Sequence, residues 1–201
     1  MLVVALITAA SSASFGAWGL YNLDRSYIGF ANSLTPGSDD YSVWNGSAGS
    51  FQGASFGTFA TGNTLTLSYY NVKTYKDGIS DVTGGTFYWR VYTAGSPSGT
   101  FNSIALNWEA DLGGGNQRWG LSGNTTNLLA GLSFNTGLKN YTLEIYAQMN
   151  GTNPGGSVFD NNNSNPTNYT ASLSTVPEPG TIGLIGLGAL AIGAGVRRRK
   201  A

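Results

Sequence analysis

Five stretches of this chain alternate apolar and polar residues with a period of two, and this alternation limits the possible folds strongly. Successive side chains of a β-strand point to opposite faces, so such alternation is typical of strands that are buried on one side. The five stretches are TLTLSYY (64–70), TFYWRVY (86–92), SIALNWE (103–109), YTLEIYA (141–147) and YTASL (169–173). We therefore expect an all-β domain, built as an antiparallel β-sandwich or jelly roll.

Each stretch has an apolar stripe that the alternation places on one face. These stripes are Leu65, Leu67 and Tyr69; Phe87, Trp89 and Val91; Ile104, Leu106 and Trp108; Tyr141, Leu143, Ile145 and Ala147; and Tyr169, Ala171 and Leu173. In residues 86–92 the opposite face is aromatic too, so either face of that strand can be the outer one. Lys76–Gly78 (KDG) predicts a hairpin, and AGSPSG and LGGGNQ predict further turns.

The composition favours strands and turns, and it excludes several classes of function. Apolar residues make up 41% of the chain, charged residues only 10%, and the net charge is zero. Balanced charge argues against a nucleic-acid binder. The absence of histidine and cysteine removes disulfides, thiolate chemistry and the commonest metal ligands, so we expect no cofactor and no transition metal. The Asn-rich segment Asn150–Asn168 reads as a polar surface loop.

The N-terminus has features of a signal peptide over residues 1–13. Leu2–Ala10 is apolar, and the small residues Ser11 and Ala13 fit the positions three and one before a signal-peptidase cut. No lysine or arginine precedes Arg25, so a positive n-region is missing. The alternative is that LVVALI forms an ordinary first strand.

The C-terminal end, residues 176–201, has three parts in a fixed order. Pro177, Glu178 and Pro179 come first, and the prolines favour an extended backbone. An apolar, glycine-rich span follows, Ile182–Val196, which as a helix is roughly 22 Å long against a hydrocarbon core of ~30 Å. If the span begins near residue 180, a transmembrane helix over about 180–196 is just long enough to cross the hydrocarbon core. A basic cluster ends the chain and is expected on the cytoplasmic side: Arg197, Arg198, Arg199 and Lys200.

This order of parts closely resembles the PEP-CTERM sorting signal of Gram-negative bacteria. The resemblance covers only about the last 26 residues. It implies export through a signal peptide, transient anchoring in the inner membrane, and removal of the tail by a membrane-embedded exosortase that reads Pro177–Pro179. It also implies a bacterium that makes exopolysaccharide, and a final location at the cell surface or outside the cell. Signal peptidase and exosortase are the processing partners, and exopolysaccharide is a candidate partner for the domain at 14–175.

The activity of that domain is the least constrained feature. Tyr88, Arg90 and Tyr92 share one strand face, where aromatic rings can stack on sugars and a charged group can fix hydroxyls. The alternative is that all these aromatic residues belong to the core. Glu109 and Glu144 lie in expected strands and are the candidate pair for glycoside hydrolysis, although solvated strand faces ordinarily carry such residues. We expect a non-catalytic protein with a structural or adhesive role beside exopolysaccharide. The alternatives are a carbohydrate-binding module and, third, a polysaccharide-active enzyme.

Overall fold

The computed structural model describes residues 17–21, 26–35, 37–43, 49–134, 137–162 and 168–177, and every regular element among them is a β-strand. The all-β class is therefore confirmed. The strands are β1 Trp18–Leu20, β2 Ser26–Asn32, β3 Ser38–Val43, β4 Ser55–Phe59, β5 Leu65–Lys76, β6 Asp81–Thr93, β7 Asn102–Gly113, β8 Asn116–Ser122, β9 Lys139–Thr152, β10 Gly156–Asp160 and β11 Tyr169–Thr175.

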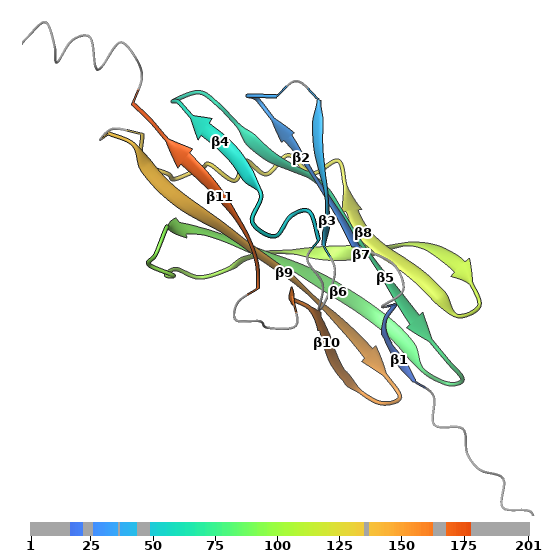
Figure 1. Ribbon diagram of the computed structural model, residues 1–201. Helices are drawn as coiled ribbons and strands as arrows, with labels where there is room; N and C mark the ends of the chain where they lie inside the picture. The colour runs from blue at the N-terminus through green and yellow to red at the C-terminus, as the bar shows by residue number, and fades with distance from the viewer. Residues whose placement is uncertain are drawn as a thin grey trace, which may run out of the picture.

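The strands form one curled, open sheet rather than the two separate sheets of a sandwich or jelly roll (Figure 1). Its order is β3-β2-β5-β8-β7-β6-β9-β11-β4, with β1 beside β5 and β10 beside β9. The pairings are antiparallel except for β4 with β11, which is parallel. The first half of β7 pairs with β6 and its second half pairs with β8, so this single strand connects the two layers.

A short segment bridges the two layers near the opposite edge. The N–H of Phe51 donates to the carbonyl of Ser42 on β3 at 3.1 Å, and the N–H of Gly53 donates to the carbonyl of Thr170 on β11 at 2.8 Å. The N–H of Ser172 donates in turn to the carbonyl of Ala54. Residues 49–54 thereby satisfy backbone groups of both layers that would otherwise stay unpaired.

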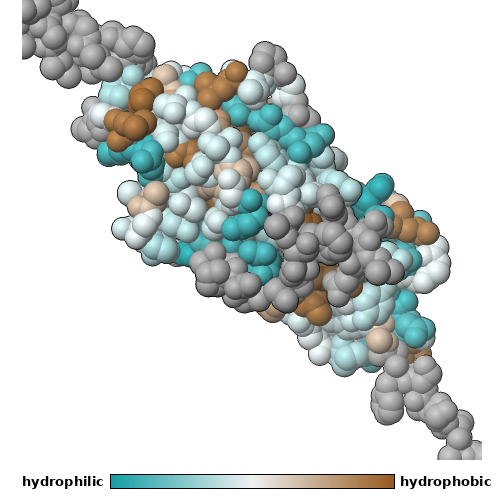
Figure 2. Space-filling model, viewed as in Figure 1, coloured by the Kyte–Doolittle hydropathy of each residue, from teal (hydrophilic) through white to brown (hydrophobic). Residues whose placement is uncertain are grey.

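Polar side chains cover much of the outer surface. On the face shown in Figure 2, apolar side chains form small patches that are separated by polar residues. Large apolar residues stand exposed at scattered positions in sequence, among them Ile79 at 71%, Trp108 at 54% and Tyr27 at 45%. Scattered exposure of this kind is ordinary for a globular surface, so each exposed ring must be judged by its neighbours.

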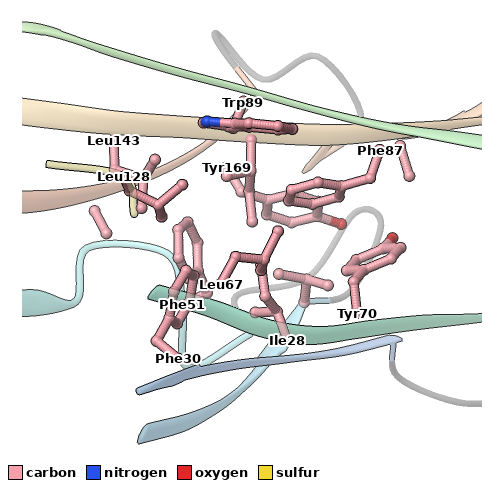
Figure 3. Packing of buried hydrophobic residues seen from close by; sticks show 14 of the residues in the cluster. Ile28, Phe30, Phe51, Leu67, Tyr70, Phe87, Trp89, Leu128, Leu143 and Tyr169 are labelled. Carbon is pink, nitrogen blue, oxygen red and sulfur yellow. The ribbon is translucent and has the colours of Figure 1, made fainter. Parts of the chain in front are cut away.

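The core lies between the two layers (Figure 3). Trp89 and Leu143 enter it from β6 and β9, while Ile28 and Leu67 enter it from β2 and β5. Many of the packed residues are aromatic, and rings meet at centroid distances such as 4.8 Å between Tyr70 and Phe87. The expected inward stripes of the strands at 86–92, 141–147 and 169–173 are largely buried, as alternation predicts.

Two stripes were wrong in part, and a β-bulge explains the first. On β5 an extra residue, Ser68, lies between the pairs Gly29–Tyr69 and Phe30–Leu67. The bulge reverses the faces, so Tyr70 is buried instead of Tyr69. On β7 the register shift comes after Trp108, which pairs with the buried Trp119, yet the Trp108 side chain is exposed rather than part of the core.

Two expectations for turns and loops were also wrong. Lys76–Gly78 forms a turn, but β5 and β6 are not paired, so this turn connects the two layers and does not close a hairpin. The segment Asn150–Asn168 is not a loop throughout, because it contains the end of β9 and all of β10. Asp160 is buried there and accepts hydrogen bonds from the hydroxyls of Tyr70 at 2.9 Å and Tyr169 at 2.6 Å.

Some predicted features lie outside the described residues. They are the signal peptide at 1–13, the transmembrane span at 180–196, Glu178, Pro179 and the basic cluster Arg197–Lys200. Within the described ranges, the search for membrane spans found no helix of sufficient length and apolar character to cross a bilayer. β11 ends at Thr175, and the N–H of Val176 donates to the carbonyl of Phe59 at 2.9 Å, one residue before Pro177.

Candidate functional site

Tyr88, Arg90 and Tyr92 lie together on the outer face of β6, but their groups are already engaged. The Tyr88 ring stacks on Tyr146 of β9, with centroids 4.6 Å apart and planes 9° from parallel. The Arg90 guanidinium lies over the rings of Tyr92 and Phe101, at 5.2 and 4.4 Å from their centroids. Tyr92 is buried beneath it. This cluster is an ordered part of the sheet surface, and it leaves little aromatic face open for a sugar.

The Arg90 guanidinium is held in place by Glu144. Oε2 of Glu144 accepts from Nη2 of Arg90 at 2.7 Å and from Nε at 2.8 Å, and its Oε1 accepts from the Asn168 amide at 2.7 Å. The Glu144 side chain is only 4% exposed. Burial, followed by the charge of Glu144, raises the pKa of Tyr92, which therefore keeps its proton near neutral pH.

The two candidate catalytic carboxylates are not brought together as a working pair. Glu144 on β9 is bound by Arg90, whereas Glu109 on β7 is bound by Arg118 of β8 at 3.0 Å. A general acid and base in glycoside hydrolysis must both face one substrate. Two carboxylates held by separate arginines of separate strands do not provide that arrangement.

A hollow of about 540 Å³ lies where β7 changes its pairing partner. Pairing of β7 with β6 ends at Leu106, and pairing with β8 begins at Asn107. The hollow is lined by Ile104, Ala105, Asn107, Trp108, Glu109, Gly120, Leu121, Ser122 and Asn124. We call this set the β7–β8 groove.

Trp108 is the most exposed aromatic side chain of the β7–β8 groove. The register shift beside it places Glu109 on the same face as Arg118, where the two form their ion pair. Gly120 makes room for the Glu109 carboxylate, since a Cβ at position 120 would lie 2.5 Å from Oε1. The groove thus combines an open indole with the amides of Asn107 and Asn124 and the carboxylate of Glu109, which is held by Arg118 from outside the lining. These groups match the apolar faces and hydroxyls of a sugar.

A second hollow of about 310 Å³ is a weaker candidate. It is lined by residues such as Trp89, Asn102 and Leu128, which are near the rim of the core, and no charged residue lines it. No group of three or more histidine, cysteine, aspartate or glutamate side chains within the described ranges could hold a metal ion.

The sequence analysis and the structure point to different aromatic residues as candidates. Alternation assigned Trp108 to the core and left Tyr88 and Tyr92 as the candidates for an outer face. Trp108 keeps the face that alternation gives it, opposite the buried Trp119, and no spacing within SIALNWE reveals that its side chain stays exposed. Glu109 was already a candidate from the sequence. Its position over Gly120 depends on the pairing of β7 with β8, which the sequence does not predict.

Comparison with known proteins gives a result for the tail alone. Residues 175–200 match the family described as PEP-CTERM protein-sorting motif. The earlier resemblance is thereby confirmed: this chain carries a PEP-CTERM sorting motif, which implies export and sorting by an exosortase at the membrane toward the cell surface. No curated protein and no solved structure matches the chain.

Proposed function

We propose that this protein has a structural or adhesive role at the cell envelope or in the extracellular matrix, and that it holds exopolysaccharide non-covalently in the β7–β8 groove. The observation that carries the proposal is Trp108, a large indole that is 54% exposed at a hollow bordered by an ion pair and by amides. The export signal supports the location, because an exported protein of this kind meets polysaccharide outside the cell.

The physical chemistry of the groove supports sugar as the ligand. A sugar ring has apolar C–H faces that pack against an aromatic ring, and equatorial hydroxyls that need donors and acceptors. Glu109 supplies acceptors and Arg118 supplies donors in a pair whose side chains are 27% and 43% exposed. Indole also brings a large contact area at low cost in conformational entropy, as aromatic anchors do in other binding sites.

We propose binding without turnover. Glu109 is tied to Arg118, and Glu144 is buried with both oxygens occupied. These contacts hold both carboxylates in fixed positions, which suits holding a ligand better than exchanging protons with one.

Retention on polysaccharide tests the proposal. The full chain, purified in detergent, is passed over immobilised exopolysaccharide from the producing cells, and Trp108→Ala is compared with Phe159→Ala. Phe159 is an exposed aromatic residue of β10, 42% accessible, and does not line the groove. We expect Trp108→Ala to weaken binding at least about tenfold, as loss of a central aromatic anchor does, and Phe159→Ala to bind as the natural protein does.

Two results would refute the proposal. One is the absence of any retention of the natural protein on exopolysaccharide. The other is equal retention of the natural protein and Trp108→Ala, with circular dichroism showing that both are folded. Release of soluble reducing sugar during the assay would point to the enzyme alternative instead.

A further inference from the structure

We infer that the second hollow binds a small neutral molecule with an apolar body and a hydrogen-bond acceptor oxygen, such as a ketone. We call this cavity of about 310 Å³ the Trp89 hollow, and its lining includes Trp89, Val91, Thr126, Asn127, Leu128 and Ala130. Its volume is near the lower end of the roughly 300–1,000 Å³ that is typical of small-molecule sites. The inference does not depend on the proposed function, because the Trp89 hollow and the β7–β8 groove share no lining residue.

One wall of the Trp89 hollow is held in place by the backbone of β5. The N–H of Leu128 donates to the carbonyl of Leu65 at 2.8 Å, and the N–H of Leu67 donates to the carbonyl of Thr126 at 3.1 Å. Trp89 enters the lining from β6, which belongs to the other layer. The hollow therefore lies between two fixed layers, and a ligand would meet a preformed site rather than a loop that must first be ordered.

Trp89 provides the first hydrogen-bond donor of the hollow. It is only 9% exposed, and within the described residues its indole N–H has no acceptor. Among the same residues, Nε1 of Trp119 is an unpartnered atom that is fully enclosed, whereas Nε1 of Trp89 is not enclosed. Figure 3 shows this nitrogen at the end of the Trp89 ring that points away from Phe87, on the side of Leu128. Since Trp89 and Leu128 both line the hollow, the N–H is open to a ligand there.

Asn127 provides the second donor, because its oxygen is already engaged. Its Oδ1 accepts from the N–H of Leu65 at 3.3 Å and from the N–H of Leu129 at 3.1 Å. These two bonds fix the orientation of the amide, whose nitrogen has no acceptor in the described part of the chain. None of the described residues that line the hollow is charged. An acceptor oxygen would satisfy both donors, whereas an ionised carboxylate would lose its hydration without gaining a cation.

Two probe molecules of nearly the same shape test the inference. Acetophenone carries a carbonyl oxygen where α-methylstyrene carries a CH₂ group, and both are neutral. Equilibrium dialysis of the full chain in detergent, with the same detergent on both sides, gives the affinity for each probe. We expect acetophenone to bind about fivefold more tightly than α-methylstyrene, as one net hydrogen bond allows. Nuclear magnetic resonance of the ¹⁵N-labelled chain should show that the indole N–H signal of Trp89 shifts with the same saturation.

Three variants locate the site and its donor. Trp89→Phe removes the N–H, assigns the Trp89 signal, and should bring the affinity for acetophenone down to that for α-methylstyrene. Ala130 is an exposed residue of the lining, so Ala130→Phe should fill the hollow and block both probes while Trp89 stays in place. Ala94→Phe is the matched control. It places the same ring in the exposed turn after β6, outside the hollow, and should bind both probes as the natural protein does.

Several outcomes would overturn the inference. They are no saturable binding of acetophenone, equal affinity for the two probes, tighter binding of benzoate than of acetophenone, and full binding by a folded Ala130→Phe. Should Trp89→Phe fail to fold, the comparison of the two probes and the Ala130→Phe variant still decide. Trp108→Ala, the variant that tests the proposed function, should bind acetophenone normally. Loss of acetophenone binding in a folded Trp108→Ala would show that the probe occupies the β7–β8 groove instead.

Discussion

Glu144 is an almost fully buried carboxylate, and its neighbours show how the outer face of β6 and β9 is stabilised. Arg90 donates twice to one of its oxygens and Asn168 donates to the other. A buried ion pair contributes modestly to stability as a whole, but removal of one partner leaves an uncompensated charge. The structure thus assigns Arg90 a structural task where its position on a strand face suggested sugar binding.

Arg90→Ala should lower the free energy of unfolding by about 3 kcal/mol, since the Glu144 carboxylate would stay buried without its cation. Urea unfolding followed by tryptophan fluorescence measures the change. The double variant Arg90→Ala/Glu144→Leu should recover much of the loss. If Arg90→Ala alone proves neutral, the pair is not important for stability.

Tyr88→Ala should leave retention on exopolysaccharide unchanged and reduce stability by about 1 kcal/mol, because it removes a ring stacked on Tyr146 and no part of the β7–β8 groove. Parallel binding and urea experiments check both halves of this expectation. A loss of retention with intact stability would return the sugar site to the face of β6.

The buried tyrosines make stability sensitive to alkali. Burial, then the charge of Asp160, raises the pKa of Tyr70 and of Tyr169 above the usual value near 10. Above about pH 10 the unfolded chain loses these protons while the folded chain keeps them, so the unfolding free energy should fall by up to about 1.4 kcal/mol per pH unit for each tyrosine. Below pH 10 this contribution is fully present. Urea titrations from pH 8 upward should show the decline, and a Tyr70→Phe variant that declines just as steeply would contradict it.

Strand β5 shows what a pattern within one element can and cannot predict. Its inward residues Leu65 and Leu67 follow from alternation alone, and most stripes of β6, β9 and β11 do as well. The exchange of Tyr70 for Tyr69 depends on a bulge against β2, a partner far away in the sequence. Bulges accommodate the twist and bending of a sheet, and these depend on several strands together. The sequence of one strand therefore does not predict where a bulge occurs.

The same limit applies to the connections and to the candidate site. The KDG stretch predicts a turn correctly, but whether a turn closes a hairpin or changes layers depends on which strands pair elsewhere. The sequence left open which face of residues 86–92 is the outer one, and the engagement of Arg90 with Glu144 needed the register of β6 and β9. The exposure of Trp108 does not follow from alternation, which places this residue on the same face as the buried Leu106.

The bridge at residues 49–54 should be important for closing the curled sheet. Phe51 is fully buried at its centre, so Phe51→Ala should cost about 3–5 kcal/mol through loss of contacts and the cavity that remains. Hydrogen exchange should show faster exchange at Gly53 and Ser172, whose amides bond across the bridge. Ile79→Ala, at a residue 71% exposed, is the control and should change neither quantity. Protected amides at Gly53 in a destabilised Phe51→Ala would show that the bridge does not depend on this ring.

For the whole molecule, the position of the sorting motif has a direct consequence for processing. The last hydrogen bond of the sheet in this region involves Val176, and the Pro-Glu-Pro triplet begins at the next residue. We expect an exosortase to act on the tail without unfolding β11. Replacement of Pro177, Glu178 and Pro179 together by alanine should leave export intact but prevent release, so that the protein stays with the membrane at a higher mass.

Intact-mass measurement of the natural protein outside the cell checks this expectation, because it should end before Arg197. Pro97→Ala in the turn after β6 is the control and should be processed normally. If the natural exported protein keeps residues 197–201 in cells with an active exosortase, the tail is a permanent anchor.

The parallel pairing of β11 with β4 also has a mechanical consequence. Until the tail is removed, tension between a membrane anchor and a bound polymer enters the sheet through β11, which lies between β9 and β4 and whose end is far from β1 in Figure 1. Tension along the strand shears the ladders on both sides at once, so their bonds resist together rather than opening one after another. The molecule is thus suited to withstand stretching along β11 while it is anchored. Once the tail is cut, that route for force is lost, and under the proposed function the protein is then free to move with the polymer that it binds.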